Sequence, residues 1–234
     1  MGGEDAPIGL AEARSALAWW LEAGVDIAVQ EQPRDWLKPA PAQPKASPAP
    51  EPAIVEPEPT HETLEQFRDW LATAPRLPMA GNAARRVLPH GVEEAEIMLL
   101  AEAPEDSAGP LSGEVWELAT RMLAAIRIEA ENAYSASLSC FHAPGARMSA
   151  PEREACAEIA RRHVALARPK RLLLLGDGPC VALLGKRLVE ARGHIHKIEG
   201  VRTVATFHPR QLINQPSNKS LAWKDLLLLM EDES

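Results

Sequence analysis

The stretch RLLLLGDGPCVALLGKRLVEA, residues 171–191, decides the fold. Its first part, Arg171–Leu175, is an arginine followed by a continuous apolar run of leucines, which is typical of a strand buried on both faces. The glycines of Gly176-Asp177-Gly178 then allow a tight turn, and a helix is expected from there to about Ala191. A buried strand that leads through a glycine turn into a helix is the building unit of a parallel α/β sheet.

The same alternation extends along the chain on both sides of this stretch. Further strands are expected at Ile97–Ala101, Ala133–Cys140 and Val201–Thr206. Helices are expected at Thr63–Leu71, Ser112–Ile126, Ser149 to about Ala167, and Ser217 to about Met230. Ser149 and Glu152 form a capping box at the start of the third helix. We therefore expect an α/β fold with three αβα layers around a short, mostly parallel, four-stranded sheet.

The first sixty residues differ from this pattern. Residues 9–23 have helical apolar spacing, and the Trp19–Trp20 pair there could pack on the main domain or on a protein partner. Residues 38–60 contain eight prolines, which predicts a semi-rigid extended linker. The expected organisation is a helical appendage at 1–37, a Pro-rich linker at 38–60 and an α/β domain at 61–234.

Composition restricts the class of protein. No apolar run approaches the roughly 18–20 residues of a membrane span, and the acidic N-terminus does not resemble a signal peptide. Three cysteines do not suggest a disulfide framework, so we expect a soluble, cytoplasmic, reduced protein. The formal net charge is −8, yet residues 151–224 carry 14 Lys and Arg against 6 Asp and Glu. This basic segment fits either a polyanionic partner or a solvated charged surface.

Polar or glycine residues follow three of the expected strands. Glu102 follows the first, Gly176-Asp177-Gly178 the third and His208 the fourth. The glycine turn could cradle an anion or simply connect a strand to a helix. His208, fixed by Pro209, could face a ligand or be a structural histidine, and Glu102 could be a capping carboxylate. Their common place at the carboxyl ends of parallel strands favours a ligand site there.

Other residue groups offer weaker metal or nucleophile candidates. They are a histidine pair and a cysteine–histidine set: His194, His196, Cys140, His142 and Cys156. The pair lies on one face of an extended segment but has no evident third ligand, and the set has no fourth. Buried, inert cysteines are the simpler interpretation of the set. Cys180 lies at a helix start, where a thiolate is favoured, but no base accompanies it in the sequence.

Between residue 64 and about residue 230, the order of motifs resembles the uracil-DNA glycosylase superfamily, and within it the iron–sulfur branch. The most specific part is TFHPRQLINQPS at 206–217, followed by Trp223-Lys224-Asp225-Leu226. Ala101–Pro104 matches most of the family's Gly-Glu-Ala-Pro-Gly motif, and Leu175–Gly185 matches its glycine turn.

The resemblance implies a function and assigns roles. Such enzymes flip a base, uracil or a related damaged base, out of DNA and hydrolyse its N-glycosidic bond. By similarity, His208 stabilises the departing base anion, and Glu102 positions water and stabilises the sugar cation. The implied contacts with DNA come from Arg210, Gln211 and Lys219.

The resemblance also implies a base pocket. Its residues would be Ala101, Ala103, Pro104, Glu105, Leu111 and Ala136. Four of them depart from the family: Ala101 and Glu105 replace glycines, Leu111 replaces a stacking aromatic, and Ala136 replaces an asparagine that reads the base edge. Loss of the stacking and reading groups would weaken binding and discrimination.

The iron–sulfur branch holds a four-iron cluster with four cysteines. Cys140 and Cys156 match the two later ligands, whereas residues 77–90 contain no cysteine. We therefore expect no cluster and no other cofactor. Two functions stay open: an active glycosylase with altered base preference, or a degenerate member that binds DNA or a protein partner without cleaving.

Overall fold

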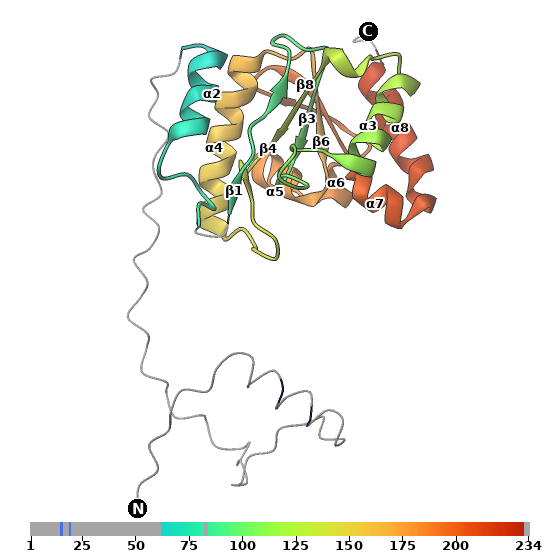
Figure 1. Ribbon diagram of the computed structural model, residues 1–234. Coiled ribbons are helices and arrows are strands. Elements are labelled where there is room, and N and C mark those ends of the chain that lie inside the picture. Colours follow the sequence, from blue (N-terminus) through green and yellow to red (C-terminus); the bar gives the residue numbers. More distant parts are fainter. Residues whose placement is uncertain (1–14, 16–18, 20–61, 82–83, 232–234) are drawn as a thin grey trace, which may run out of the picture. The chain divides into compact units, whose positions relative to one another are not determined.

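The computed structural model describes residues 62–81 and 84–231, together with Ser15 and Trp19. The chain falls into two units, Met1–Ala49 and Pro50–Ser234, and all helices and strands below belong to the second (Figure 1). Ser15 and Trp19 are helical, while the rest of the expected N-terminal helix and the Pro-rich linker lie outside the described residues. The expected domain boundaries stay predictions.

A six-stranded sheet forms the centre of the second unit, in the order β2-β4-β3-β6-β8-β7. Its strands are β2 (His90–Gly91), β3 (Ile97–Ala101), β4 (Ala133–Ser137), β6 (Arg171–Leu175), β7 (Ile195–Ile198) and β8 (Val201–Thr206). The inner four, β4-β3-β6-β8, are mutually parallel, which confirms the expected parallel sheet. The edge strands β2 and β7 are antiparallel to their neighbours. A separate small ladder pairs β1 (Arg85–Arg86) with β5 (Phe141–His142).

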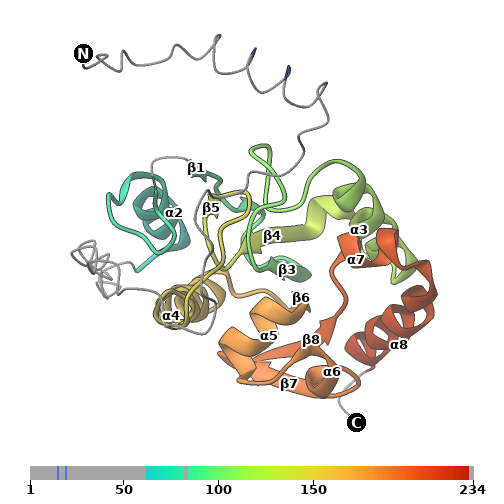
Figure 2. The same cartoon turned by 90° about the horizontal axis from the view of Figure 1, so that it is seen from below.

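Helices cover both faces of the sheet (Figures 1 and 2). On one side lie α4 (Ala150–Ala167), α5 (Asp177–Leu184) and α6 (Leu188–Ala191), with α2 (Leu64–Thr73) packed on α4. On the other side lie α3 (Gly113–Ala125) and α8 (Lys219–Met230), with α7 (Pro209–Asn214) beside α3. No helix within residues 62–81 or 84–231 is long and apolar enough to cross a bilayer.

The strand sequences explain the three layers. In β3, Met98 and Leu100 enter the core under α4 and α5, whereas Ile97 and Leu99 enter the core under α3 and α8. The leucines of β6 divide in the same way. Because successive side chains point to opposite faces, a strand that is apolar throughout must be covered on both.

Several helix boundaries differ from the expectation. The Ser149 capping box is confirmed, but the helix expected as far as Ala191 is interrupted at Gly185, whose φ is +65°. The last helix, expected from Ser217, begins later, because α8 starts at Lys219 after the N-cap Asn218. The additional short helix α7 starts at Pro209, where proline satisfies the first helical position.

Candidate active site

The carboxyl ends of three parallel strands line one open cleft of about 610 Å³. Glu102 follows β3, Gly176-Asp177-Gly178 follows β6, and His208 follows β8. The structure therefore brings together the three strand ends that the sequence singled out. This is the edge at which open α/β sheets bind ligands.

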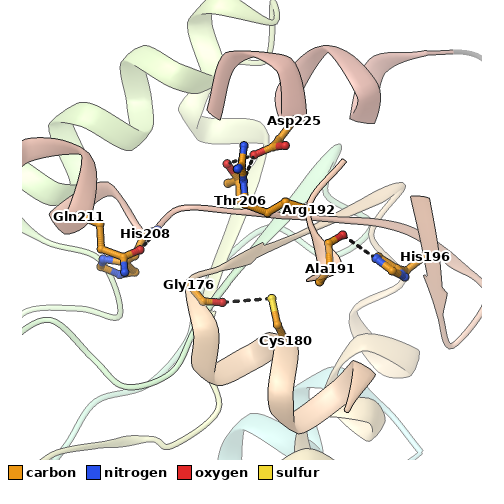
Figure 3. A network of polar contacts seen from close by, with 9 residues as sticks. All are labelled: Gly176, Cys180, Ala191, Arg192, His196, Thr206, His208, Gln211 and Asp225. Carbon is orange, nitrogen blue, oxygen red and sulfur yellow. Dashed lines mark hydrogen bonds and ion pairs between the residues drawn. The ribbon is translucent and has the colours of Figure 1, made fainter. Parts of the chain in front are cut away.

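The chain around His208 holds the ring in one protonation state. His208 is the N-cap of α7, and its Nδ1 accepts a hydrogen bond from the backbone N of Arg210 at 3.2 Å. The backbone N of His208 donates to Oε1 of Gln211 at 3.1 Å (Figure 3). Burial lowers the pKa of His208; the charge of Glu105 opposes this shift and that of Arg210 reinforces it. The ring is therefore neutral at pH 7, and its proton is on Nε2, which makes this atom a hydrogen-bond donor.

Glu102 lies against the first turn of α5. A Cβ atom at position 178 would be only 2.4 Å from Cδ of Glu102, so the carboxylate occupies space that Gly178 leaves free. The carbonyl of Glu102 accepts a hydrogen bond from the backbone N of Ser139 at 3.1 Å, which extends the pairing of β3 with β4. A carboxylate at this helix N-terminus is favoured by the helix dipole.

An ion pair links the two sides of the cleft. Nε of Arg210 donates to Oε1 of Glu105 at 2.7 Å, and Nη2 of Arg210 contacts the same oxygen. Glu105 belongs to the loop after β3, and Arg210 lies in the first turn of α7. Because β6 lies between β3 and β8, the pair joins two segments separated by a strand. Arg210, which we expected to contact DNA, has Glu105 as its partner.

The other expected site residues divide into three sets. Ala103 and Gln211 also line the cleft. Pro104 is buried, and its carbonyl is bonded to Nδ1 of His142 at 3.1 Å. The remaining four lie elsewhere: Ala101, Leu111 and Ala136 are in the apolar core, and Lys219 lines a groove between α3 and α8. Leu111 and Ala136, which the resemblance places at the family's stacking and base-reading positions, therefore do not line the cleft.

Two basic residues of the cleft were missed by the sequence reasoning. Arg147 precedes α4 and Arg153 lies in its first turns, and both line the cleft. Nη2 of Arg153 donates to the carbonyl of Met148 at 3.3 Å. The sequence shows that both arginines lie beside the Ser149 capping box. It does not show that the start of α4 faces the carboxyl ends of the strands.

Residues 88–228 match the family model of the uracil DNA glycosylase superfamily. The chain belongs to this superfamily. The matched region contains the four parallel strands and every strand end that lines the cleft. Uracil-DNA glycosylases act on DNA, so membership supports DNA as the partner of this chain. A search of curated proteins finds no matching relative.

The residues present do not fit the four-cysteine cluster that the iron–sulfur branch implies. The chain has three cysteines, and burial raises the pKa of Cys140 to about 11 and that of Cys156 to about 12. Both border a cavity of only about 20 Å³, lined in part by Leu71 and Leu77. Cluster ligands are thiolates and four are needed. That no cofactor is bound stays a prediction.

The weaker metal and nucleophile candidates have structural contacts. Nε2 of His196 lies 2.8 Å from the carbonyl of Ala191, and Sγ of Cys180 donates to the carbonyl of Gly176 at 3.1 Å (Figure 3). Burial raises the pKa of Cys180 to about 12, so it is a thiol at neutral pH. Within the described residues, no group of three or more His, Cys, Asp or Glu side chains is arranged to hold a metal ion.

Proposed function

We propose that this chain removes a base from DNA by hydrolysing its N-glycosidic bond. Water adds its hydroxyl to C1′ of the sugar, and the base leaves with the remaining proton, so the products are an abasic site and a free base. The observation that carries the proposal is the convergence of a neutral His208 and the carboxylate of Glu102 in one cleft at the strand ends.

His208 supplies the hydrogen bond that the leaving base needs. As the glycosidic bond breaks, negative charge develops on the base. A neutral imidazole with its proton on Nε2 can donate to that anion, and a partly buried donor is worth more than one in water. Because Nδ1 is already bonded to the backbone of Arg210, the ring is held with Nε2 as its free donor atom.

Glu102 acts on the sugar side of the same bond. Its carboxylate can accept a proton from the attacking water and stabilise the positive charge that develops at C1′. Gly178 leaves the space in which this carboxylate lies. Arg147 and Arg153 add positive charge to the cleft, which favours contacts with the phosphates of a flipped nucleotide.

A second candidate function is DNA binding without base excision. It is favoured by the positions of Leu111 and Ala136, which are 3% and 1% exposed in the core and so offer the cleft no stacking or reading group. Glu105 also binds Arg210, which would otherwise be available to contact DNA. On this alternative, the chain is a degenerate member of the iron–sulfur branch, and a protein partner could bind its N-terminal helix.

Single-turnover excision on uracil-containing single- and double-stranded oligonucleotides tests the proposal. His208→Ala should reduce the rate about 10²–10³-fold, as for loss of one anion-stabilising donor, and Glu102→Gln should reduce it about 10²–10⁴-fold. His194→Ala, an exposed histidine outside the cleft, is the matched control and should retain the parent rate.

The outcomes separate the two candidates. Excision that persists in His208→Ala refutes the assigned chemistry. Salt-sensitive DNA binding without excision of any base in a panel of damaged oligonucleotides supports the second candidate. Absence of both excision and binding refutes both, and would direct attention to the N-terminal region and a protein partner.

A further inference from the structure

Behind His208, a buried polar cluster ties the end of β8 to α8. Oγ1 of Thr206 donates to Oδ2 of Asp225 at 2.8 Å, and Nε of Arg192 donates to the same oxygen at 2.8 Å (Figure 3). The side chain of Asp225 is only 2% exposed and that of Arg192 only 15%. Water is therefore largely excluded from this ion pair.

Arg192 also contacts the residue next to His208. Its Cζ lies 4.3 Å from the ring centroid of Phe207, so the guanidinium covers the face of that ring. A guanidinium is planar: its edge donates hydrogen bonds to a carboxylate while its face stacks on an aromatic ring. A single side chain thus links α8 to the residue that precedes His208.

The cluster is separate from the cleft, which neither Arg192 nor Asp225 lines. Burial raises the pKa of Asp225, and the hydrogen bonds from Arg192 and Thr206 oppose this shift. A buried ion pair is weak evidence of a gain in stability, because the cost of desolvation offsets the attraction between the charges. The ion pair lies next to the segment that carries His208, and this location suggests a role in holding that segment in place.

We propose that Arg192 is a positioning residue for His208. Held by Asp225, its guanidinium clamps Phe207 and so fixes the backbone that carries the His208 ring at the edge of the cleft. The proposal rests on the proposed function in that His208 is the catalytic group there. A ring displaced by 1 Å would lose much of its catalytic effect, about 10²-fold for a misplacement of that size.

The substitution Arg192→Lys tests the clamp. Lysine keeps the positive charge opposite Asp225 but has no planar face for Phe207. Arg202→Lys is the matched control, because Nη2 of Arg202 ties β8 to α8 as well, through the carbonyl of Leu228 at 2.9 Å. That contact lies at the other end of the strand from His208.

The first readout is the titration of the His208 ring by NMR, which needs no enzymatic activity. The ring is assigned by its absence in His208→Gln. Its charged neighbours, Glu105 from the loop after β3 and Arg210 from α7, are unchanged in both lysine variants. In Arg192→Lys the midpoint should rise from its lowered value toward the ordinary 6.5, because a loosened ring is better solvated. In Arg202→Lys it should stay at the parent value.

The second readout is single-turnover excision, which should fall about 10²-fold in Arg192→Lys and stay at the parent rate in the control. Phe207→Leu removes the ring but leaves the ion pair intact, so it replaces Arg192→Lys if that variant does not fold. Phe207→Leu should give the same upward shift of the His208 titration midpoint.

The readouts also separate the two proposals. An unchanged His208 titration in folded Arg192→Lys or Phe207→Leu overturns the positioning role. A shifted titration in a protein that excises no base supports the positioning role and refutes the glycosylase.

Discussion

The Glu105–Arg210 pair should control how strongly this protein responds to salt when it binds DNA. Glu105→Gln removes the charge that holds Arg210 and leaves the shape of the side chain intact. If the released arginine neutralises one more phosphate, the slope of log K against log salt becomes steeper by about 0.9 on duplex DNA. Between 50 and 200 mM salt, the variant should then lose about threefold more affinity than the parent.

The assay is fluorescence anisotropy of a labelled duplex at four or more salt concentrations. Glu117→Gln is the matched control: it changes the net charge equally and frees Arg121, its partner at 3.4 Å on the exposed face of α3. The control should keep the parent slope, and Glu105→Gln combined with Arg210→Ala should return to it. Equal slopes for the two glutamine variants would refute the idea that Glu105 withholds Arg210 from phosphate.

Three further predictions follow from glycine packing, a buried histidine and the cysteines. Gly178→Ala should displace Glu102 and slow any excision at least tenfold without unfolding, whereas Gly81→Ala, with no atom within 4 Å of its new Cβ, should leave the rate unchanged. Burial lowers the pKa of His163 to about 3, so below pH 6.5 the unfolded chain binds a proton that the folded chain does not. As the pH is lowered from 6 to 4, His163 should therefore reduce the free energy of unfolding by about 1.4 kcal/mol per pH unit. Urea titrations of His163→Gln at the same pH values should lack that contribution. Burial raises the pKa of Cys140 to about 11 and the pKa of the other two thiols to about 12, so thiol reagents at pH 8 should label the chain rapidly only after unfolding, and purified protein should contain no iron.

The central strands β3 and β6 could be predicted from sequence because, apart from Arg171, each is wholly apolar. The leucines of Arg171–Leu175 permit only a strand covered on both faces, and the glycine turn after it defines where the strand ends. The edge strands could not be predicted in this way. β2 has two exposed residues, and β7 buries only Ile198 fully, so each depends largely on hydrogen bonds to a neighbouring strand rather than on its own hydrophobicity.

Part of the cleft could be predicted for a related reason. Once the strands are parallel, Glu102 and His208 must come to the same edge of the sheet, whatever the loops do. The loops themselves are not constrained by periodicity. Leu111 packs in the core under α3 instead of facing the cleft, and Arg147 and Arg153 enter the cleft from the start of α4. Those positions follow from tertiary packing, which a pattern along the chain does not encode.

The pair of Glu105 and Arg210 bears on whether the expected departures from the family motif would abolish the proposed chemistry. A glutamate in place of a glycine, taken alone, would put an uncompensated negative charge beside His208 and favour the imidazolium form. Arg210 counters it, because the two charges shift the pKa of His208 in opposite directions, and burial is the largest influence that remains. The ring therefore stays neutral in spite of the added carboxylate. On the proposed function, Glu105 would change how the cleft meets DNA but would leave intact the proton on Nε2 that His208 donates to the leaving base.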